Sequence, residues 1–413
     1  MTRKTGPLSE NLYLSAREAA AELGVSLATL YAYVSRDMIR SEPVPDSRAK
    51  RYRAEDVRAL KSRRVATRLD APPTDGRGGT LSFGQPVLDS AITLIADGKL
   101  YYRGADSTAL AATSSLEQIA ALLWGCRDVQ PFTPDALPRL SPRLIEIAAS
   151  VAGLPAVEQC LALLPVAALE DPTVYNMTAR GLATTGARLM RLVTGIIAGV
   201  PPSTQPAHEV LARALTFGDA GAAHLIRMAL VLCADHELNA SAFTARCIAG
   251  TGATLYAATQ GGICAAQGPR HGGLSNRVEG FIAEMSNRLD VEDGVLARLR
   301  DNDPVPGFGH PLYPDGDPRA VPLLAELKKL YGDDPAFLRT RRIAHVMAEA
   351  GGLKPNIDFA IGVLASVLRM PRGAGLSVFV LGRTAGWIGH AMEQYRTGLM
   401  IRPRARYTGD IPR

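Results

Sequence analysis

Residues 67–80, TRLDAPPTDGRGGT, place the strongest constraint on how this chain can fold. The segment holds two prolines and three glycines and has no periodic apolar positions. Proline removes a backbone donor and glycine raises the entropic cost of ordering the backbone, so neither a helix nor a strand is expected to run through it. We therefore predict a linker at 67–80, between a domain of residues 1–66 and a larger body from residue 81 onward.

The two parts differ in charge. Residues 1–70 contain 14 Lys and Arg against 9 Asp and Glu, whereas the remaining 343 residues contain 32 against 31. Positive charge confined to one segment favours an acidic partner for that segment. No uncharged apolar run reaches about 18 residues and the N-terminus lacks an apolar signal core, so we expect a cytoplasmic protein without a membrane partner.

Residues 12–35 predict two short helices joined by a tight turn. Ser15 and Glu18 have the spacing of a capping box. Gly24 is expected to end the first helix and Ser26 to cap the second. Two helices joined by a glycine turn are the helix-turn-helix pattern.

A basic segment follows, RAKRYR at residues 48–53, and then a helix expected from Ala54 to about Arg64. Residues 12–66 resemble the small winged helix-turn-helix domain of the MerR and excisionase type, in which such a basic hairpin touches phosphates. The resemblance implies DNA binding. The candidate contacts are Thr29, Tyr31, Lys50 and Arg51. The alternative is a module for protein contacts, since the second helix has Arg36 as its one basic residue.

The body beyond the linker predicts an all-α fold. Alanine and leucine are abundant and only 6% of residues are aromatic, which favours packed helices over sheets. Prolines between 130 and 205 predict helix starts and breaks. Asp97-Gly98 predicts a turn between two short extended pieces, and the spacing of Ser114 and Glu117 predicts a capping box.

The cysteine and histidine patterns give no sign of a disulfide or a metal site. The five cysteines are odd in number and lack CxxC spacing, so we expect small buried residues. The histidines lack HxxxH or HxH spacing. Four histidines without motif partners are assigned to surface or packing positions, namely His208, His224, His345 and His390.

Four clusters after residue 220 carry the groups that could do chemistry. They combine three histidines, one candidate carboxylate base and several arginines, mostly beside Gly or Pro. Arginine grips carboxylates in a bidentate fashion and histidine polarises a carbonyl or passes a proton, so the set suits a small di- or tricarboxylate. The clusters are ADHELN at 234–239, GPRHGG at 268–273, GFGH at 307–310 with DPRA at 317–320, and PNIDF at 355–359 with GRTAGW at 382–387.

These clusters, in this order, resemble the citrate synthase family over residues 81–413. The family condenses acetyl-CoA with oxaloacetate to citrate and free CoA, with acetyl-CoA as substrate and no further cofactor. The resemblance implies an all-α homodimer of two-domain subunits, preceded here by the winged helix-turn-helix domain. The large domain would comprise 81–270 and 370–413, and a smaller, mobile domain of 271–369 would close over substrate.

The resemblance also implies residue roles. Asp358 would be the base that takes a proton from the acetyl methyl, His271 would stabilise the enol, and His310 would polarise the oxaloacetate ketone. Four further residues would bind oxaloacetate, the last reaching in from the partner subunit: His236, Arg319, Arg383 and Arg402.

The chain departs from the family in two places. Cys233 stands where the family usually has a histidine, and Pro311 and Pro314 stand where it usually has basic residues that help hold CoA. Arg270, where leucine is common, could contact CoA instead. Two alternatives stay open: a 2-methylcitrate synthase that uses propionyl-CoA, and a DNA-binding regulator whose non-catalytic body senses a carboxylate or acyl-CoA.

Overall fold

The computed structural model describes residues 13–23, 25–35, 38–44, 50–57, 60, 88–126, 129–405 and 407–409. The predicted linker at 67–80, Gly24 and Arg36 lie outside these residues, as does most of the helix predicted up to Arg64.

The chain divides into two compact units, each built from segments that are separate in sequence. The first unit comprises Met1–Val87, Ala283–Asp317 and Leu338–Asn356. The second unit comprises Leu88–Ile282, Pro318–Phe337 and Ile357–Arg413. The predicted 271–369 domain stays a prediction.

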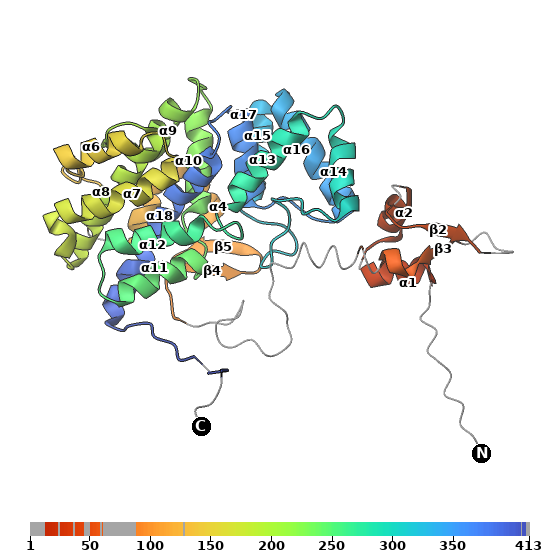
Figure 1. Cartoon of the computed structure of the whole chain (residues 1–413), viewed down its shortest axis with the longest axis horizontal. Helices are drawn as coiled ribbons and strands as arrows, with labels where there is room; N and C mark the ends of the chain where they lie inside the picture. Colours follow the sequence, from red (N-terminus) through yellow and green to blue (C-terminus); the bar gives the residue numbers. More distant parts are fainter. Residues whose placement is uncertain are drawn as a thin grey trace, which may run out of the picture. The chain divides into compact units, whose positions relative to one another are not determined.

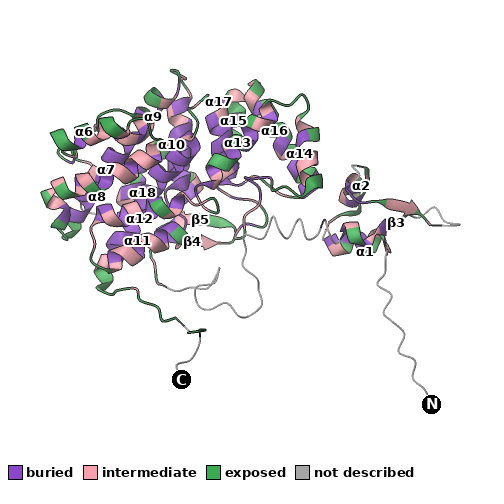
Figure 2. Cartoon of the chain, in the orientation of Figure 1, coloured by how far each residue is buried: buried purple, intermediate pink, exposed green. Residues whose placement is uncertain are grey.

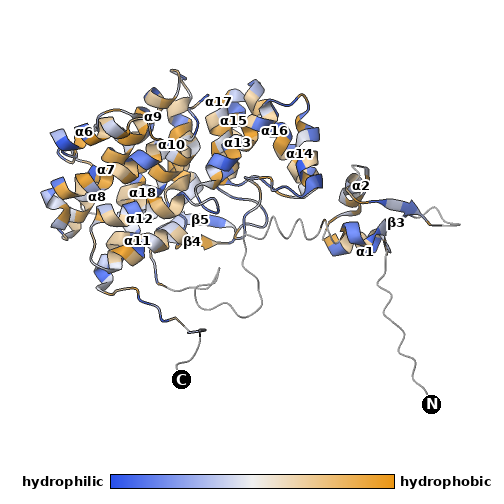
Figure 3. Cartoon of the chain, viewed as in Figure 1, coloured by the Kyte–Doolittle hydropathy of each residue, from blue (hydrophilic) through white to orange (hydrophobic). Residues whose placement is uncertain are grey.

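The N-terminal part contains two short helices and a small sheet (Figure 1). Its elements are β1 Tyr13–Ser15, α1 Ala16–Leu23, α2 Leu27–Ser35, β2 Ser41–Pro43 and β3 Lys50–Arg53, with antiparallel strands in the order β1-β3-β2. Figure 3 shows hydrophilic residues along this sheet. The capping box is confirmed: the Ser15 N–H donates to Glu18 Oε2 at 2.8 Å, and the Glu18 N–H donates to Ser15 Oγ at 3.3 Å. Ser26 Oγ likewise accepts the Thr29 N–H.

Helices dominate the second unit, beside one small antiparallel sheet of β4 Thr93–Ala96, β5 Lys99–Tyr102 and β6 Ala105–Asp106. Its helices are α4 Ser107–Thr113, α5 Leu116–Trp124, α6 Pro142–Val151, α7 Ala156–Glu170, α8 Ala179–Ala198, α9 Ala207–Leu215, α10 Ala222–Cys233, α11 Ala240–Gly250, α12 Leu255–Ala266, α15 Ala320–Tyr331, α17 Ile357–Val367 and α18 Ala374–Thr397. A 3₁₀ helix spans Pro172–Tyr175. Helix α13, Leu274–Ser286, starts in this unit and ends in the first.

The described helices of the first unit beyond residue 283 include α14 Val291–Asp301 and the π-helix Met347–Gly351. Helix α16, Pro335–Val346, starts in the second unit and ends in the first. Among the described helices, none is long and apolar enough to cross a membrane.

The Asp97-Gly98 turn between β4 and β5 is confirmed. Two other local predictions need correction, namely the capping box of α5 and the prolines as helix boundaries. The capping box of α5 uses Ser115 and Gln118, one residue after the predicted Ser114 and Glu117. The reason is that the Ser114 N–H already ends α4 by donating to Leu110 O, and Glu117 instead accepts the Ala207 N–H.

Prolines do not all mark helix boundaries. Pro142 starts α6 and Pro172 starts the 3₁₀ helix, as predicted. Pro165, however, lies inside α7, which continues to Glu170. Burial of the flanking Leu163, Leu164 and Ala167 supplies tertiary packing that offsets the lost backbone hydrogen bond.

Helix α18 forms the centre of the second unit. It packs against α5, α8, α10, α11 and α12, and Figure 2 shows it almost wholly buried. Gly382 and Gly386 let it approach the end of α10 closely. A Cβ on Gly382 would lie 2.7 Å from Leu230 O, and one on Gly386 would lie 2.5 Å from Ala234 O and would also meet Asp235. The Gly386 N–H donates to Ala234 O at 3.0 Å.

Substitution of these glycines tests this close approach. We expect Gly386→Ala to lower the free energy of unfolding by about 1–3 kcal/mol, because the added methyl overpacks against backbone. Gly389→Ala, on the same helix, is the matched control. A Cβ there would lie 3.4 Å from its nearest neighbour, so helix propensity should leave stability equal or raised by up to about 1 kcal/mol. Urea unfolding measures both; equal losses for the two variants would contradict the packing described.

Candidate active site

The first element of the site is the turn of residues 234–239, which links α10 to α11. Glu237 has a left-handed φ of 56°, and Asn239 caps α11 by accepting two backbone N–H groups, each at 3.1 Å. The last carbonyls of α10 are also satisfied, since the Tyr102 hydroxyl donates to Val231 O at 2.9 Å. The turn holds His236, which is only 7% exposed.

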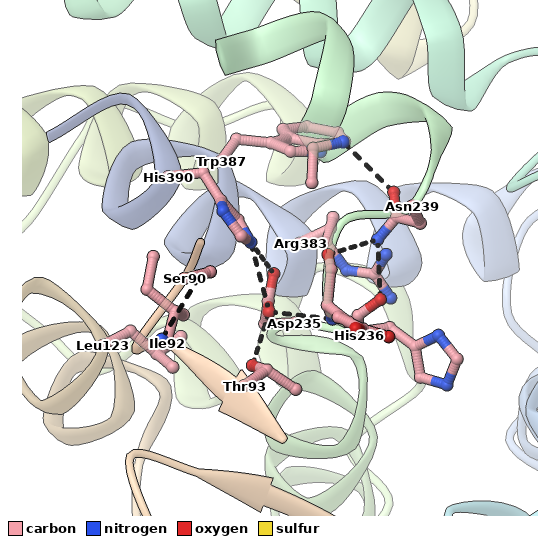
Figure 4. Close-up of polar contacts among 12 residues, drawn as sticks. Ser90, Ile92, Thr93, Leu123, Asp235, His236, Asn239, Arg383, Trp387 and His390 are labelled. Carbon is pink, nitrogen blue, oxygen red and sulfur yellow. Dashed lines mark hydrogen bonds and ion pairs between the residues drawn. The ribbon is translucent and has the colours of Figure 1, made fainter. Parts of the chain in front are cut away.

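The Asp235 carboxylate holds this turn through several hydrogen bonds and an ion pair (Figure 4). It accepts the Thr93 hydroxyl at 2.5 Å and the Glu237 N–H at 3.1 Å. His390 Nε2 lies 3.2 Å from one carboxylate oxygen and 3.4 Å from the other. Burial alone would raise the pKa of Asp235, but His390, Arg383 and Thr93 together bring that pKa below its ordinary value.

Sequence reasoning missed His390 as part of this network and assigned it to packing. His390 lies seven residues after Arg383 on α18, so the two share one helix face, but no local spacing in the sequence identifies Asp235 as its partner.

Two buried arginines make the site electropositive. Arg383 is 1% exposed and Arg319, which precedes α15, is 3% exposed. Burial lowers the pKa of Arg383, and the like charge of Arg319 lowers it further. Arg383 Nε donates to Cys233 O at 2.7 Å, and its guanidinium lies 4.7 Å from the Phe379 ring centre. Buried cations of this kind are stabilised by an anionic ligand.

His271 belongs to the same cluster. It lies in the turn between α12 and α13, and its ring meets Phe379 edge-on at 5.7 Å. Burial, followed by the charges of Arg383 and Arg319, lowers the pKa of His271 to about 3. The imidazole is therefore neutral at physiological pH.

Ser241 connects the His271 ring to the 234–239 turn and to α18. Its hydroxyl donates to Asn239 Oδ1 at 2.7 Å and its oxygen accepts the Trp387 indole N–H at 3.0 Å. The same Oγ lies 2.7 Å from His271 Nε2, so a hydrogen bond to Ser241 fixes the orientation of the imidazole.

Asp358 is joined to the segment that follows this turn. It sits in the first turn of α17 and accepts the Ser275 hydroxyl at 2.7 Å. Ser275 is at the start of α13, four residues after His271. The structure thus ties the predicted base to the segment that carries the predicted enol stabiliser.

His310 lies in the first unit, in a segment held by its own backbone contacts. Asn356 brackets this segment: its side chain donates to Gly309 O at 3.1 Å and its N–H donates to Gly307 O at 2.9 Å. His310 Nδ1 accepts the Leu312 N–H at 3.2 Å. A neutral His310 therefore carries its proton on Nε2 and can donate it.

The remaining predicted contacts lie on the surface. Arg270 is exposed in the 268–273 turn, and Arg402 is exposed in the segment after α18. In the N-terminal part Tyr31 and Lys50 are exposed and Thr29 is half-buried. Arg51 is engaged within the chain: it pairs with Glu42 at 3.0 Å and covers the Tyr13 ring.

No group of three or more potential metal-binding side chains occurs among the residues that the structure describes. Cys233 is fully buried, and burial raises the pKa of the equally buried Cys160 thiol. The arrangement of the second unit is therefore a site of imidazole, carboxylate and guanidinium groups, suited to a small anionic substrate with a carbonyl.

Comparisons with known proteins agree with this geometry. Residues 81–404 match the family described as "Citrate synthase, C-terminal domain". The chain is 30% identical to "Citrate synthase 2" of Bacillus subtilis (strain 168), over 78% of this chain and 93% of that protein. It is 28% identical to a "2-methylcitrate synthase" of Mycobacterium tuberculosis (strain ATCC 25618 / H37Rv), over 86% and 96%. Its fold is similar to the crystal structure of citrate synthase from Thermotoga maritima MSB8, with a TM-score of 0.66, 25% identity, and coverage of 80% and 95%.

The low pKa of His271 predicts an effect on acid stability. An unfolded histidine titrates near about 6.5, so below that pH the unfolded chain binds a proton that the folded chain takes up only near pH 3. The free energy of unfolding should therefore decrease as the pH is lowered from about 6.5 towards about 3, by up to about 1.4 kcal/mol per pH unit from this group. His271→Gln should reduce the fall in melting temperature between about pH 6.5 and 4.5.

The matched control is His345→Gln, since His345 is 52% exposed and pairs with Glu349 on the surface. Thermal unfolding at a series of pH values measures all three proteins. A His271→Gln variant that loses melting temperature as steeply as wild type when the pH is lowered would contradict a neutral, half-buried His271.

Proposed function

We propose that the chain, which belongs to the citrate synthase family and is a transferase, condenses acetyl-CoA with oxaloacetate and water to citrate and CoA. One observation carries the proposal: a neutral His271 beside the buried Arg319 and Arg383, with Asp358 joined to the same segment. This combination supplies a base, a donor for an enol oxygen and a cradle for a dicarboxylate.

Asp358 would start the reaction by taking a proton from the methyl group of acetyl-CoA. The methyl proton is weakly acidic, so a carboxylate needs a donor aimed at the oxygen where charge develops. His271 would donate an imidazole N–H to that oxygen. The enol carbon would then form a bond to the ketone carbon of oxaloacetate, and water would cleave the thioester to release CoA.

Oxaloacetate would be held by its two carboxylates and its ketone. Arg319, Arg383 and His236 would bind the diacid, and His310 would donate a proton to the ketone oxygen as the new bond forms. The exposed position of Arg402 is compatible with its predicted role, in which it reaches the oxaloacetate of the other subunit of a homodimer.

The acyl-CoA could also be propionyl-CoA, which would make the product 2-methylcitrate. The chain is similar to relatives of both names, and one methylene in a pocket is worth about 1–3 kcal/mol, so both thioesters belong in the assay. Pro311 and Pro314 replace the expected basic residues, and the exposed Arg270 is the proposed replacement contact for CoA.

Release of the CoA thiol tests the reaction directly. With oxaloacetate, the wild type should release thiol from acetyl-CoA or propionyl-CoA, and Asp358→Asn should lower kcat by about 10²–10⁴-fold because the base is lost. Asp333→Asn, an exposed carboxylate, is the control and should leave kcat unchanged. If wild type releases no oxaloacetate-dependent thiol from either thioester, the synthase proposal is wrong and a non-catalytic sensor becomes the better account.

A second proposed function belongs to the N-terminal part, a winged helix-turn-helix domain that binds DNA. Two capped helices and an antiparallel sheet with an exposed Lys50 support it. The internal pairing of Arg51 with Glu42 leaves less free positive charge for phosphates than the sequence suggested.

The affinity of the full chain for DNA should fall steeply as the salt concentration rises. Each phosphate that the protein neutralises contributes about −0.9 to the slope of the logarithm of the binding constant against the logarithm of the salt concentration. Removal of residues 1–66 should abolish the binding. Lys50→Ala should weaken it and reduce the salt slope by about one, whereas Lys328→Ala on the helical body should not. Fluorescence anisotropy with a DNA duplex measures this; salt-independent binding, or unchanged binding without residues 1–66, would count against a DNA-binding domain.

A further inference from the structure

The Asp235–His390 pair has no role in the reaction steps proposed above, yet it is deeply buried beside the residues that carry them. Both side chains are 0% exposed. A buried carboxylate is stable only when paired and hydrogen-bonded, so a pair at this depth strongly restrains the backbone that carries it.

The pair connects three segments that are distant in sequence (Figure 4). Asp235 belongs to the 234–239 turn, His390 to α18, and Thr93, which donates to the same carboxylate, to β4. The Glu237 N–H closes the turn on Asp235. The carboxylate therefore fixes both the turn itself and its place against α18 and β4.

Two proposed substrate-binding residues extend from these restrained segments. His236 directly follows Asp235, so a movement of the Asp235 backbone moves the His236 ring. Arg383 lies two helical turns before His390 on α18 and donates to the carbonyl of Cys233, the last residue of α10 before the turn. The negative charge of Asp235 also acts on the Arg383 guanidinium and favours its charged form.

We propose that Asp235 and His390 are positioning residues for the 2-oxo dicarboxylate, because together they hold the 234–239 turn against α18 with His236 and Arg383 in register. This inference rests on the proposed function for the identity of the diacid. Neither residue touches the substrate; the pair acts through the backbone of the turn and through α18. Loss of the pair should weaken oxaloacetate binding far more than acyl-CoA binding.

Variants of His390 separate positioning from packing. His390→Leu removes the donor to Asp235, and we expect the KM for oxaloacetate to rise about tenfold while the KM for acyl-CoA stays within about twofold. His390→Gln places an amide N–H near Nε2 and should keep the KM for oxaloacetate within about threefold of wild type. Asp235→Asn should resemble His390→Leu. Thr194→Val, which removes a buried hydroxyl that donates to Met190 O within helix α8, controls for core disruption.

Direct binding keeps the two proposals distinguishable. Calorimetric titration of the full chain with oxaloacetate alone should give saturable binding in wild type, about tenfold weaker binding in His390→Leu, and near wild-type binding in His390→Gln and Thr194→Val. Unchanged oxaloacetate affinity in folded His390→Leu, or equal loss in the Leu and Gln variants, overturns the positioning role alone. If wild type itself neither binds oxaloacetate nor turns over, the proposed function fails and the positioning role fails with it.

Discussion

The close approach of α18 to the end of α10 is the constraint on which the second unit depends. Two glycines one turn apart, Gly382 and Gly386, remove the side chains that would otherwise separate the helices. Hydrogen bonds connect α18 to the end of α10 at this point: the Gly386 N–H donates to Ala234 O, and Arg383 Nε donates to Cys233 O. The last carbonyls of α10 would otherwise be unsatisfied in a buried environment. Helix α18, which also carries the buried Arg383, supplies donors for them.

Burial then sets the chemistry of the cluster. It depresses the pKa of His271 to about 3, so the ring is a neutral donor, while Arg319 and Arg383 keep two positive charges nearly out of water. The Asp235 carboxylate compensates part of that positive charge, and an anionic substrate would compensate the rest. Such a pre-arranged set of dipoles and charges is what a reaction through an enolate requires.

The sequence predicted the mostly helical body beyond the linker and features that depend on local chemistry, such as the Ser15 and Glu18 capping box and the Asp97-Gly98 turn. It misplaced the α5 cap by one residue because Ser114 and Ser115 are both competent caps, and only the end of α4 decides between them. Pro165 was misinterpreted for a similar reason, since burial within α7 is a tertiary effect that local pattern does not report.

For the site, the glycines and prolines beside His271 and His310 marked two of the clusters that could do chemistry, and the family resemblance supplied the roles. His390 was missed because its partner Asp235 is 155 residues away in sequence, a pairing that no local spacing encodes. Arg51, which is predicted to contact DNA, is paired within the chain with Glu42, and the local sequence did not indicate that pairing. Long-range pairings of charged groups are set by the packed structure rather than by their immediate neighbours.

The central claim is that the 234–239 turn, which follows α10, and the buried Arg383 of α18 together form one binding site for a 2-oxo dicarboxylate. A crystal structure of the full chain grown with oxaloacetate tests this most directly. The account predicts density for the diacid with a carboxylate within about 3 Å of Arg383 and an oxygen within hydrogen-bonding reach of His236. A diacid bound away from both residues, at full occupancy and with the Asp235–His390 contact intact, would contradict it.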